Sequence, residues 1–330
     1  MSIRLTRLNG FAAKARSLPD FIYVRNSDDI HVLDASTLDT VKTHSTISAG
    51  NVNTGDPPSG LTVSPDGSML LTSGALGVGV YDAYDGTELH FYSNTNDQRP
   101  AMSADGAYIA YAEGLGANTR IVETSGWTEY ASFDPVLSSG EVYAFSNDGS
   151  KLAIGDQNGD FRIFNTSDQT AYSNALALSF SVRSIAFSPD DSEIAVGLRQ
   201  NAVNQLNIMT VAASMTSESV AGVEIGDDIT DVVYSPDGAV LYCFSGAQTT
   251  AAVERFSTSG YSSLGVLADD NLSQPLASGA VSEGGEIICY WTESGASDSG
   301  STLTKNLDTL VNNASPPFAG GYAIAFSRCN

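Results

Sequence analysis

Acidic side chains recur at one position of a repeated tetrapeptide, and they are the first residues here that could do chemistry. The segment Ser64-Pro65-Asp66-Gly67 returns five more times with variations. Five repeats keep the acidic residue, as Asp66, Asp105, Asp148, Asp190 and Asp237. Calcium binding is one role open to them, and the other is local, because an Asp side chain hydrogen-bonds the backbone of its own turn. One Asp per repeat is too far from the next to share an ion, which favours the turn.

Histidine is the side chain that general-base catalysis and metal binding most often use. The chain has three, His31, His44 and His90. Each falls on the third or fourth strand-like run of its repeat, which predicts an outer position away from any central channel. We therefore do not expect a histidine-based catalytic cluster.

Other carboxylates could build an acidic metal site if they converged in a channel. The candidates are Glu113, Asp156, Asp227, Asp228, Glu283 and Glu293. Their spacing singles out no set, so a solvated acidic surface is the simpler interpretation. The chain also lacks a G-x-S-x-G elbow, a Walker loop and an H-E-x-x-H motif. We predict no catalytic residues, no bound metal and no cofactor, and hence a protein that is not an enzyme.

The N-terminal 20 residues form a basic arm on an acidic body. They hold Arg4, Arg7, Lys14 and Arg16 against the single acid Asp20, so residues 1–20 carry +3 and residues 21–330 carry −26. Such an asymmetry suggests an interaction segment. We predict that the four basic residues bind a partner, another subunit or an assembly surface. The alternative is that the arm folds back onto the acidic body of its own chain.

Composition limits the partners further. The net charge of −23 repels phosphate backbones and anionic lipids, so we expect no nucleic-acid binding and no membrane insertion. Three cysteines without a C-x-x-C pair indicate neither a disulfide framework nor a zinc site. No apolar stretch has the length of a membrane helix, and the N-terminus lacks the apolar core of a secretory signal. We expect a cytoplasmic protein or a component of a virion or other large assembly.

The repeat that carries the aspartates defines the elements. Its serines are separated by 39, 43, 42, 47, 47 and 45 residues, counting the terminal Ser327. A four-stranded propeller blade takes about 40–50 residues. A large apolar residue precedes every Ser, a small one precedes that, and Asp-Gly followed by a second apolar run is a hairpin signal. Many runs are apolar at consecutive positions, as in sheets that are packed on both faces.

The two chain ends complete the last unit. Three strand-like runs, 21–24, 29–34 and 38–44, precede the first complete repeat, and one run, 322–327, follows the last. We predict that the C-terminal run is the inner strand of a blade whose outer strands are N-terminal, which leaves no exposed seam. The prediction is an all-β fold, a seven-bladed β-propeller with four-stranded antiparallel blades at 21–330, after the arm at 1–20.

The F-S-P-D-G turn followed by an L-A-x-G strand resembles the WD40-like β-propellers, and equally the YVTN-like propellers of bacteria. The resemblance covers roughly residues 21–327 and implies the fold. The Trp-Asp dipeptide is absent, since the matching positions read Leu33-Asp34, Tyr81-Asp82 and Phe164-Asn165, and the opening Gly-His is missing too. The hydrogen-bond network of those residues, and any particular partner, therefore do not carry over.

These observations favour a non-enzymatic protein-interaction or structural module. One concrete form is a subunit of a larger assembly, such as a tail or capsid-associated protein of a virion. A lactonase-like hydrolase with an acidic metal site in the channel is one alternative. A glycan-binding propeller is another, for which Trp127 and Trp291 are possible anchors if they do not simply pack in the core.

Overall fold

The computed structural model describes most of the chain from residue 21 to residue 326. The described residues are 21–26, 29–34, 37, 39–45, 60–74, 76–93, 99–114, 118–135, 137, 142–178, 180–199, 205–220, 229–246, 251–268, 276–281, 287–292, 301–306 and 323–326. Their regular structure consists of β-strands, as the sequence predicts.

The strands of the first half, in chain order, are β1 (Phe21–Asn26), β2 (Asp29–Asp34), β3 (Thr40–His44), β4 (Leu61–Val63), β5 (Met69–Gly74), β6 (Gly77–Asp82), β7 (Glu88–Ser93), β8 (Ala101–Met102), β9 (Tyr108–Ala112), β10 (Thr119–Glu123), β11 (Thr128–Phe133), β12 (Val142–Phe145), β13 (Lys151–Gly155) and β14 (Asp160–Asn165). The strands that follow are β15 (Leu176–Ala177), β16 (Val182–Phe187), β17 (Glu193–Leu198), β18 (Leu206–Thr210), β19 (Glu218–Ser219), β20 (Ile229–Tyr234), β21 (Val240–Gly246), β22 (Ala251–Ser257), β23 (Ser262–Ala268), β24 (Leu276–Val281), β25 (Ile287–Thr292), β26 (Ser301–Asn306) and β27 (Ala323–Phe326).

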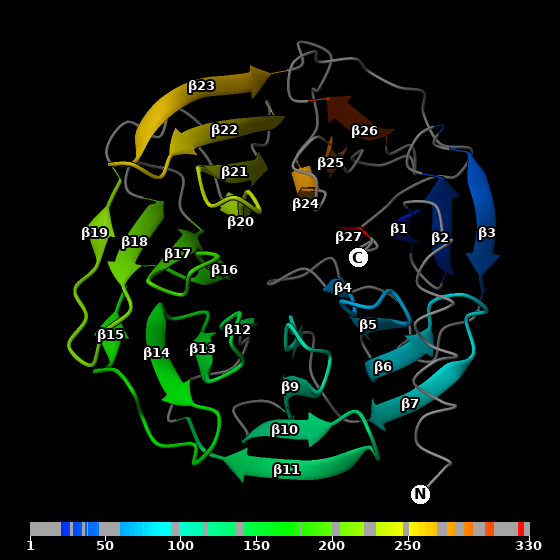
Figure 1. Ribbon diagram of the computed structural model, residues 1–330, viewed down its shortest axis with the longest axis horizontal. Coiled ribbons are helices and arrows are strands. Elements are labelled where there is room, and N and C mark those ends of the chain that lie inside the picture. The colour runs from blue at the N-terminus through cyan, green and yellow to red at the C-terminus, as the bar shows by residue number, and fades with distance from the viewer. Residues whose placement is uncertain are drawn as a thin grey trace, which may run out of the picture.

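The strands form antiparallel sheets arranged around a common centre, with one terminal strand of each sheet innermost (Figure 1). Five of the four-stranded sheets are named blades 1 to 5 in chain order: β4–β7, β8–β11, β12–β15, β16–β19 and β20–β23. The closing blade has the order β27-β1-β2-β3, so its inner strand comes from the C-terminus and its other three from the N-terminus. Strand β27 contacts both β4 and β24, which completes the ring. The predicted closure by the two chain ends is confirmed.

The number of blades differs from the prediction. The sequence predicts seven four-stranded blades, and the described residues show six, the closing blade and blades 1 to 5. The remaining sheet, β24-β25-β26, has three strands in the described part of the chain. The repeat is weakest in this unit, where Gly284 stands at the position of the turn aspartate. This unit thus lacks the side chain that organises the other turns.

The core lies between neighbouring blades rather than inside a single sheet. One cluster joins Phe161 and Ile163 of blade 3 to Val182, Ile194 and Val196 of blade 4, all fully buried. Similar clusters join blades 4 and 5, the closing blade and blade 1, blades 2 and 3, and blades 1 and 2. Second strands such as β5 and β17 are therefore buried on both faces, which explains their consecutive apolar residues.

The repeated aspartates organise the turn between the first and second strand of blades 1 to 5. In blade 3, Ser146 Oγ donates to Asp148 Oδ1 over 2.7 Å, and the same oxygen accepts the Ser150 amide over 2.8 Å. Ser146 Oγ also accepts the Lys151 amide over 2.9 Å. The same three bonds recur in the turns of blades 1, 2, 4 and 5. The interpretation of these aspartates as turn residues is confirmed.

These turns predict a loss of stability in acid that can be assigned to one residue. The hydrogen bond from Ser146, with others from Ser150, lowers the pKa of Asp148 from 3.8 to about 2. A carboxylate with a depressed folded pKa stabilises the fold above its unfolded pKa, and this stability is lost as the pH falls through the folded value. The urea midpoint of Asp148→Asn should therefore lie below that of the parent above pH 4, with the gap narrowing toward pH 2. Glu88→Gln removes an exposed charge outside the turns and controls for net charge; a gap that stays constant with pH would contradict the assignment.

Two departures from the repeated tetrapeptide pair with each other across neighbouring blades. Blade 3 has Asn147 where blades 1, 4 and 5 have Pro, and blade 4 has Asp191 where blades 1, 2, 3 and 5 have Gly. Asp191 Oδ1 accepts the Asn147 amide over 2.7 Å and its side-chain Nδ2 over 2.8 Å, and Oδ2 accepts the Asp148 amide over 2.9 Å. Asp191 keeps the left-handed backbone of the glycine position, with φ 59°. These bonds compensate for a conformation that favours Gly.

Elsewhere the same two positions meet through van der Waals contact. A Cβ built on Gly106 of blade 2 would lie 3.5 Å from Cδ of Pro65 of blade 1. One on Gly238 of blade 5 would lie 3.5 Å from Cδ of Pro189 of blade 4. The fourth residue of each of these turns thus faces the second residue of the turn one blade earlier.

We expect the two departures to be energetically coupled. Asp191→Gly relieves the left-handed strain but leaves three donors without their acceptor, a net loss of about 1–2 kcal/mol. Asn147→Pro should cost a similar amount, because Asp191 loses two of its donors. The double variant restores the Pro–Gly pair and should be more stable than the sum of the two losses implies. Urea unfolding of all four proteins gives the coupling energy; simple additivity would mean that the polar pair contributes nothing.

Candidate functional site

The hairpin between the third and fourth strands of a blade carries a second repeat, which the sequence analysis did not identify. Thr124-Ser-Gly-Trp127, Thr166-Ser-Asp-Gln169 and Thr258-Ser-Gly-Tyr261 occupy equivalent positions in blades 2, 3 and 5. Thr124 and Thr258 each donate from Oγ1 to a turn glycine carbonyl of their own blade over 2.7 Å. The common Thr-Ser pair, directly after the third strand of each blade, was the signal that could have revealed them.

The last residue of this hairpin has a left-handed backbone, with φ 55° at Trp127, 58° at Gln169 and 50° at Tyr261. Such a backbone conformation is uncommon for residues with large side chains, and it persists where contacts of the residue hold it in place. Two of the three side chains reach the preceding blade. Trp127 stacks on His90 of blade 1 with ring centroids 5.3 Å apart, and Tyr261 reaches Glu193 of blade 4.

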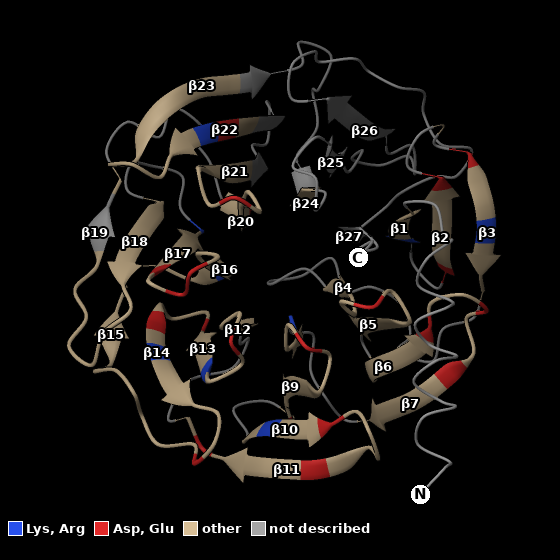
Figure 2. Cartoon of the chain, viewed as in Figure 1, with Lys and Arg blue, Asp and Glu red and all other residues tan. Residues whose placement is uncertain are grey.

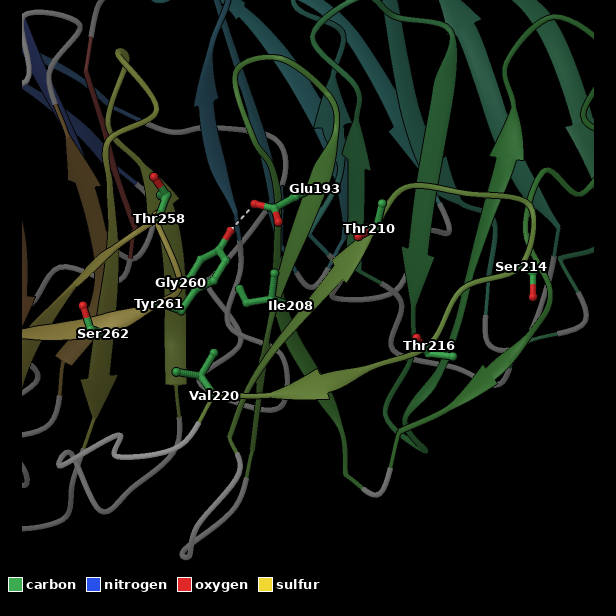
Figure 3. A pocket seen from close by; sticks show the side chains of 10 residues that line it. All are labelled: Glu193, Ile208, Thr210, Ser214, Thr216, Val220, Thr258, Gly260, Tyr261 and Ser262. Carbon is green, nitrogen blue, oxygen red and sulfur yellow. Dashed lines mark hydrogen bonds between the residues drawn. The ribbon is translucent and has the colours of Figure 1, made fainter.

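A cavity of about 610 Å³ opens beside Tyr261, between blades 4 and 5 (Figure 3). Blade 4 contributes Glu193 at the start of β17, Ile208 and Thr210 on β18, and residues of the segment from β18 to β19. Blade 5 contributes the hairpin residues 258 and 260–262. The cavity therefore lies toward the outer strands rather than at the centre of the ring.

A chain of hydrogen bonds fixes the carboxylate in this cavity. Tyr261 donates its phenol proton to Glu193 Oε2 over 2.5 Å, drawn as the dashed line in Figure 3. The Tyr234 and Tyr261 hydroxyl oxygens lie 3.0 Å apart, so Tyr234 donates to Tyr261. Burial, and then the bond to Glu193, raises the pKa of Tyr261, and burial raises that of Tyr234. Both phenols thus stay protonated and act as donors.

The rest of the cavity wall is rich in hydroxyl groups. Its hydroxyl-bearing residues besides Tyr261 are Thr210, Ser214, Thr216, Thr258 and Ser262. Glu193 is the only charged residue in the described lining, and no Lys or Arg is among the lining residues. The Glu193 Oε1 atom accepts no hydrogen bond from the described residues. The arrangement can accept hydrogen bonds from a cation or a polyhydroxylated ligand, and it contains no paired nucleophile and base among the lining side chains.

A second polar cluster links blades that are not neighbours. Arg99, just before β8 of blade 2, donates from Nη1 to Asp231 Oδ1 on β20 of blade 5 over 2.5 Å and to the Thr230 carbonyl over 2.9 Å. The other oxygen of Asp231 accepts the Gly279 amide of β24 over 2.9 Å. The two charged side chains are only 13% and 14% exposed. Because blades 3 and 4 lie between, this pair ties the inner strands together across the ring.

The histidines lie on outer strands, as predicted: His31 on β2, His44 on β3 and His90 on β7. Burial lowers the pKa of His31 and of His44. His44 Nε2 lies 3.1 Å from the Ala83 carbonyl of blade 1, so it serves the contact between two blades.

The carboxylates suggested for an acidic metal site do not converge where the structure describes them. Glu113 pairs with Arg120 of its own blade over 2.5 Å. Asp156 is buried and accepts the amides of Asn158 and Asp160, each over 2.9 Å. Asp227, Asp228, Glu283 and Glu293 lie outside the described residues. Among the described residues, no three His, Cys, Asp or Glu side chains are grouped to hold a metal ion.

Of the remaining candidates from the sequence, the structure describes some, and the others lie outside the described residues. Trp127 packs against the core between blades 1 and 2, and the backbone of Trp291 lies on β25. Cys243 is a buried free thiol whose pKa burial raises. Arg4, Arg7, Lys14 and Arg16 of the arm lie outside the described residues. No helix in the described part of the chain could span a membrane.

Comparison with known proteins identifies the architecture. No protein-family model matches the chain, and no curated protein does. A functionally unknown protein from Desulfotomaculum acetoxidans aligns with a TM-score of 0.73 and 13% identity, over 94% of this chain and 99% of that one. The Kuenenia stuttgartiensis hydrazine synthase aligns with a TM-score of 0.59 and 17% identity, over 79% of this chain and 80% of that one. At such identities the likeness shows the fold alone, a β-propeller.

Proposed function

We propose that this chain is a non-enzymatic protein-interaction or structural module that acts as a subunit of a larger assembly, such as a tail or capsid-associated protein of a virion. The observation that carries the proposal is the recess between blades 4 and 5, a fixed carboxylate among hydroxyl groups on the outer part of the ring. Loops and hairpins held by a rigid scaffold are where binding residues concentrate.

The ring supports this role because its polar groups hold the blades in place. Asp191 joins the turns of blades 3 and 4, and Arg99 with Asp231 joins blades 2 and 5. Acidic residues lie on the closing blade and on each of blades 1 to 5 (Figure 2). A rigid acidic ring suits association with a basic partner, which electrostatic attraction would steer.

The finer features of the fold belong to the same proposal. The three-stranded sheet β24–β26 fills the place of a seventh blade, since its inner strand β24 contacts both β20 and β27. The turn pattern supports a kinship with the WD40-like or YVTN-like propellers. The basic arm, residues 1–20, docks on the neighbouring subunit.

Deleting residues 1–19 tests this function. The shortened chain should keep the β-sheet circular-dichroism spectrum and a cooperative urea transition, because the ring begins at β1. It should lose association with the partner or with its own copies, as measured by sedimentation velocity and by co-purification from the source. Association that survives the deletion would refute the role of the arm.

One observation favours a second candidate, the binding of a glycan. A tyrosine ring, a carboxylate and several hydroxyls line the same recess, and such groups also recognise sugars. Titration of the full chain with neutral oligosaccharides, followed by intrinsic tyrosine fluorescence, would support this function if Tyr261→Ala abolished the signal.

A further inference from the structure

We propose that the recess between blades 4 and 5 receives an arginine or lysine side chain from the basic arm of a second copy of this chain. The inference rests on the proposed function and names the partner and the site. It starts from the charge of the recess, where Glu193 is the only charged group in the described lining.

The geometry of Glu193 suits a cationic ligand. Tyr261 and Tyr234 hold the carboxylate through Oε2, so its position is fixed before a ligand arrives. Oε1 accepts no hydrogen bond from the described residues, and a guanidinium or ammonium donor can bind it. A charge-assisted bond of this kind is about twice as strong as a neutral one. Tyr234 donates its proton to Tyr261, and Tyr261 donates its proton to Glu193. The carboxylate of Glu193 is therefore the group that accepts a hydrogen bond from the ligand.

The rest of the lining fits the same ligand. The hydroxyl oxygens of Thr210, Ser214, Thr216 and Ser262 also line the recess, and they can accept hydrogen bonds from N–H donors of the arm. The cavity of about 610 Å³ falls within the range of pockets that bury small molecules. It can therefore hold a long side chain together with atoms of the adjoining peptide.

Charge complementarity identifies the occupant. Residues 1–20 carry +3 through Arg4, Arg7, Lys14 and Arg16, whereas residues 21–330 carry −26. The basic arm is thus the segment of this chain that offers the required side chains close together in sequence. A contact between the arm of one copy and a recess of the next is heterologous, so it builds a ring or a filament of subunits.

The test uses the full chain and a synthetic peptide of residues 1–20 as the probe. Glu193→Gln keeps an acceptor for Tyr261 and removes the charge, so the fold should be preserved. It should weaken peptide binding about tenfold, the effect of one charge-assisted hydrogen bond. Glu88→Gln, at an exposed glutamate of β7 in blade 1, removes the same charge elsewhere and should change the affinity by less than about twofold. Self-association of the parent, followed by sedimentation velocity, should fall in parallel with Glu193→Gln.

Four other outcomes would contradict the assignment of the recess to the basic arm of a second copy. Equal losses in the two variants would show that the acidic surface as a whole attracts the peptide. Peptide binding that needs Glu193 in a chain that stays monomeric at all concentrations would mean that each arm occupies its own ring. Binding of a neutral oligosaccharide instead of the peptide would make the recess a glycan site. If deleting the arm abolishes association while Glu193→Gln does not, the proposed function stands and this site is wrong.

Discussion

Removal of residues 323–330 is expected to abolish the folded ring rather than trim one end of it. Strand β27 pairs with β1 in register from Ile22–Phe326 to Arg25–Ala323, and it is the inner strand of the closing blade. Its loss exposes the edge of β1 together with Ile22 and Val24, which are fully buried. An unpaired strand edge beside apolar residues is a site for aggregation.

The expected loss approaches the whole stability of the domain. Arg25 is fully buried and donates to Thr72 and to the Ser73 carbonyl of blade 1. Loss of β27 would expose this contact and the adjoining core and would remove the β1–β27 hydrogen bonds. Together these changes should lower the free energy of unfolding by more than about 5 kcal/mol, the lower end of typical domain stability. The truncated chain should therefore show no cooperative urea transition and should elute as aggregates in size-exclusion chromatography.

A strand transplant provides the control. Phe326 pairs with Ile22, so the end of β27 lies near the start of β1, and a short hairpin turn can join them. The control protein lacks residues 1–19 and 323–330 and carries residues 322–327, followed by the turn, before Phe21. It should regain the cooperative urea transition. A truncated chain that unfolds at the parent midpoint would show that β27 is dispensable for closure.

The second large effect is expected at the ion pair that spans the ring. Asp231→Asn removes the carboxylate that pairs with the almost buried Arg99 guanidinium, and breaking such a pair costs about 3–5 kcal/mol. The free energy of unfolding in urea measures the loss. Glu113→Gln breaks the exposed pair with Arg120 and should cost less than about 1 kcal/mol.

The reciprocal variants separate the pair from its surroundings. Arg99→Met removes the cation, and Arg99→Met with Asp231→Asn removes both charges at once. The double variant should be more stable than Asp231→Asn alone, because the buried Arg99 charge is then removed together with the carboxylate that paired with it. If the two have the same stability, the ion pair contributes nothing and the loss comes from the bond between Asp231 and the Gly279 amide.

The elements that the sequence predicts well are those whose hydrogen bonds close within a few residues. Ser146, Asp148 and the amide of Lys151 satisfy one another inside a single turn, so the tetrapeptide alone predicts the turn and its spacing predicts the blades. Closure by the two ends follows from counting strands in the incomplete units, and β27 beside β1 confirms it. The outer position of the histidines was predicted by the same count.

The contacts that decide the candidate site are not local in sequence. Glu193 and Tyr261 are 68 residues apart, and Arg99 and Asp231 are 132 apart. Glu193 and Tyr261 meet because the ring sets blade 4 against blade 5, and Arg99 and Asp231 meet because the ring brings the inner strands of blades 2 and 5 together. The repeat along the chain does not specify which of these side chains face each other. The described residues show four strands in six blades and three in β24–β26, whose repeat has Gly284 in place of the aspartate. Sequence thus determined the turns, six of the seven predicted four-stranded blades and their order. The packing of the ring alone decided which side chains form the recess, because that depends on distances between blades rather than along them.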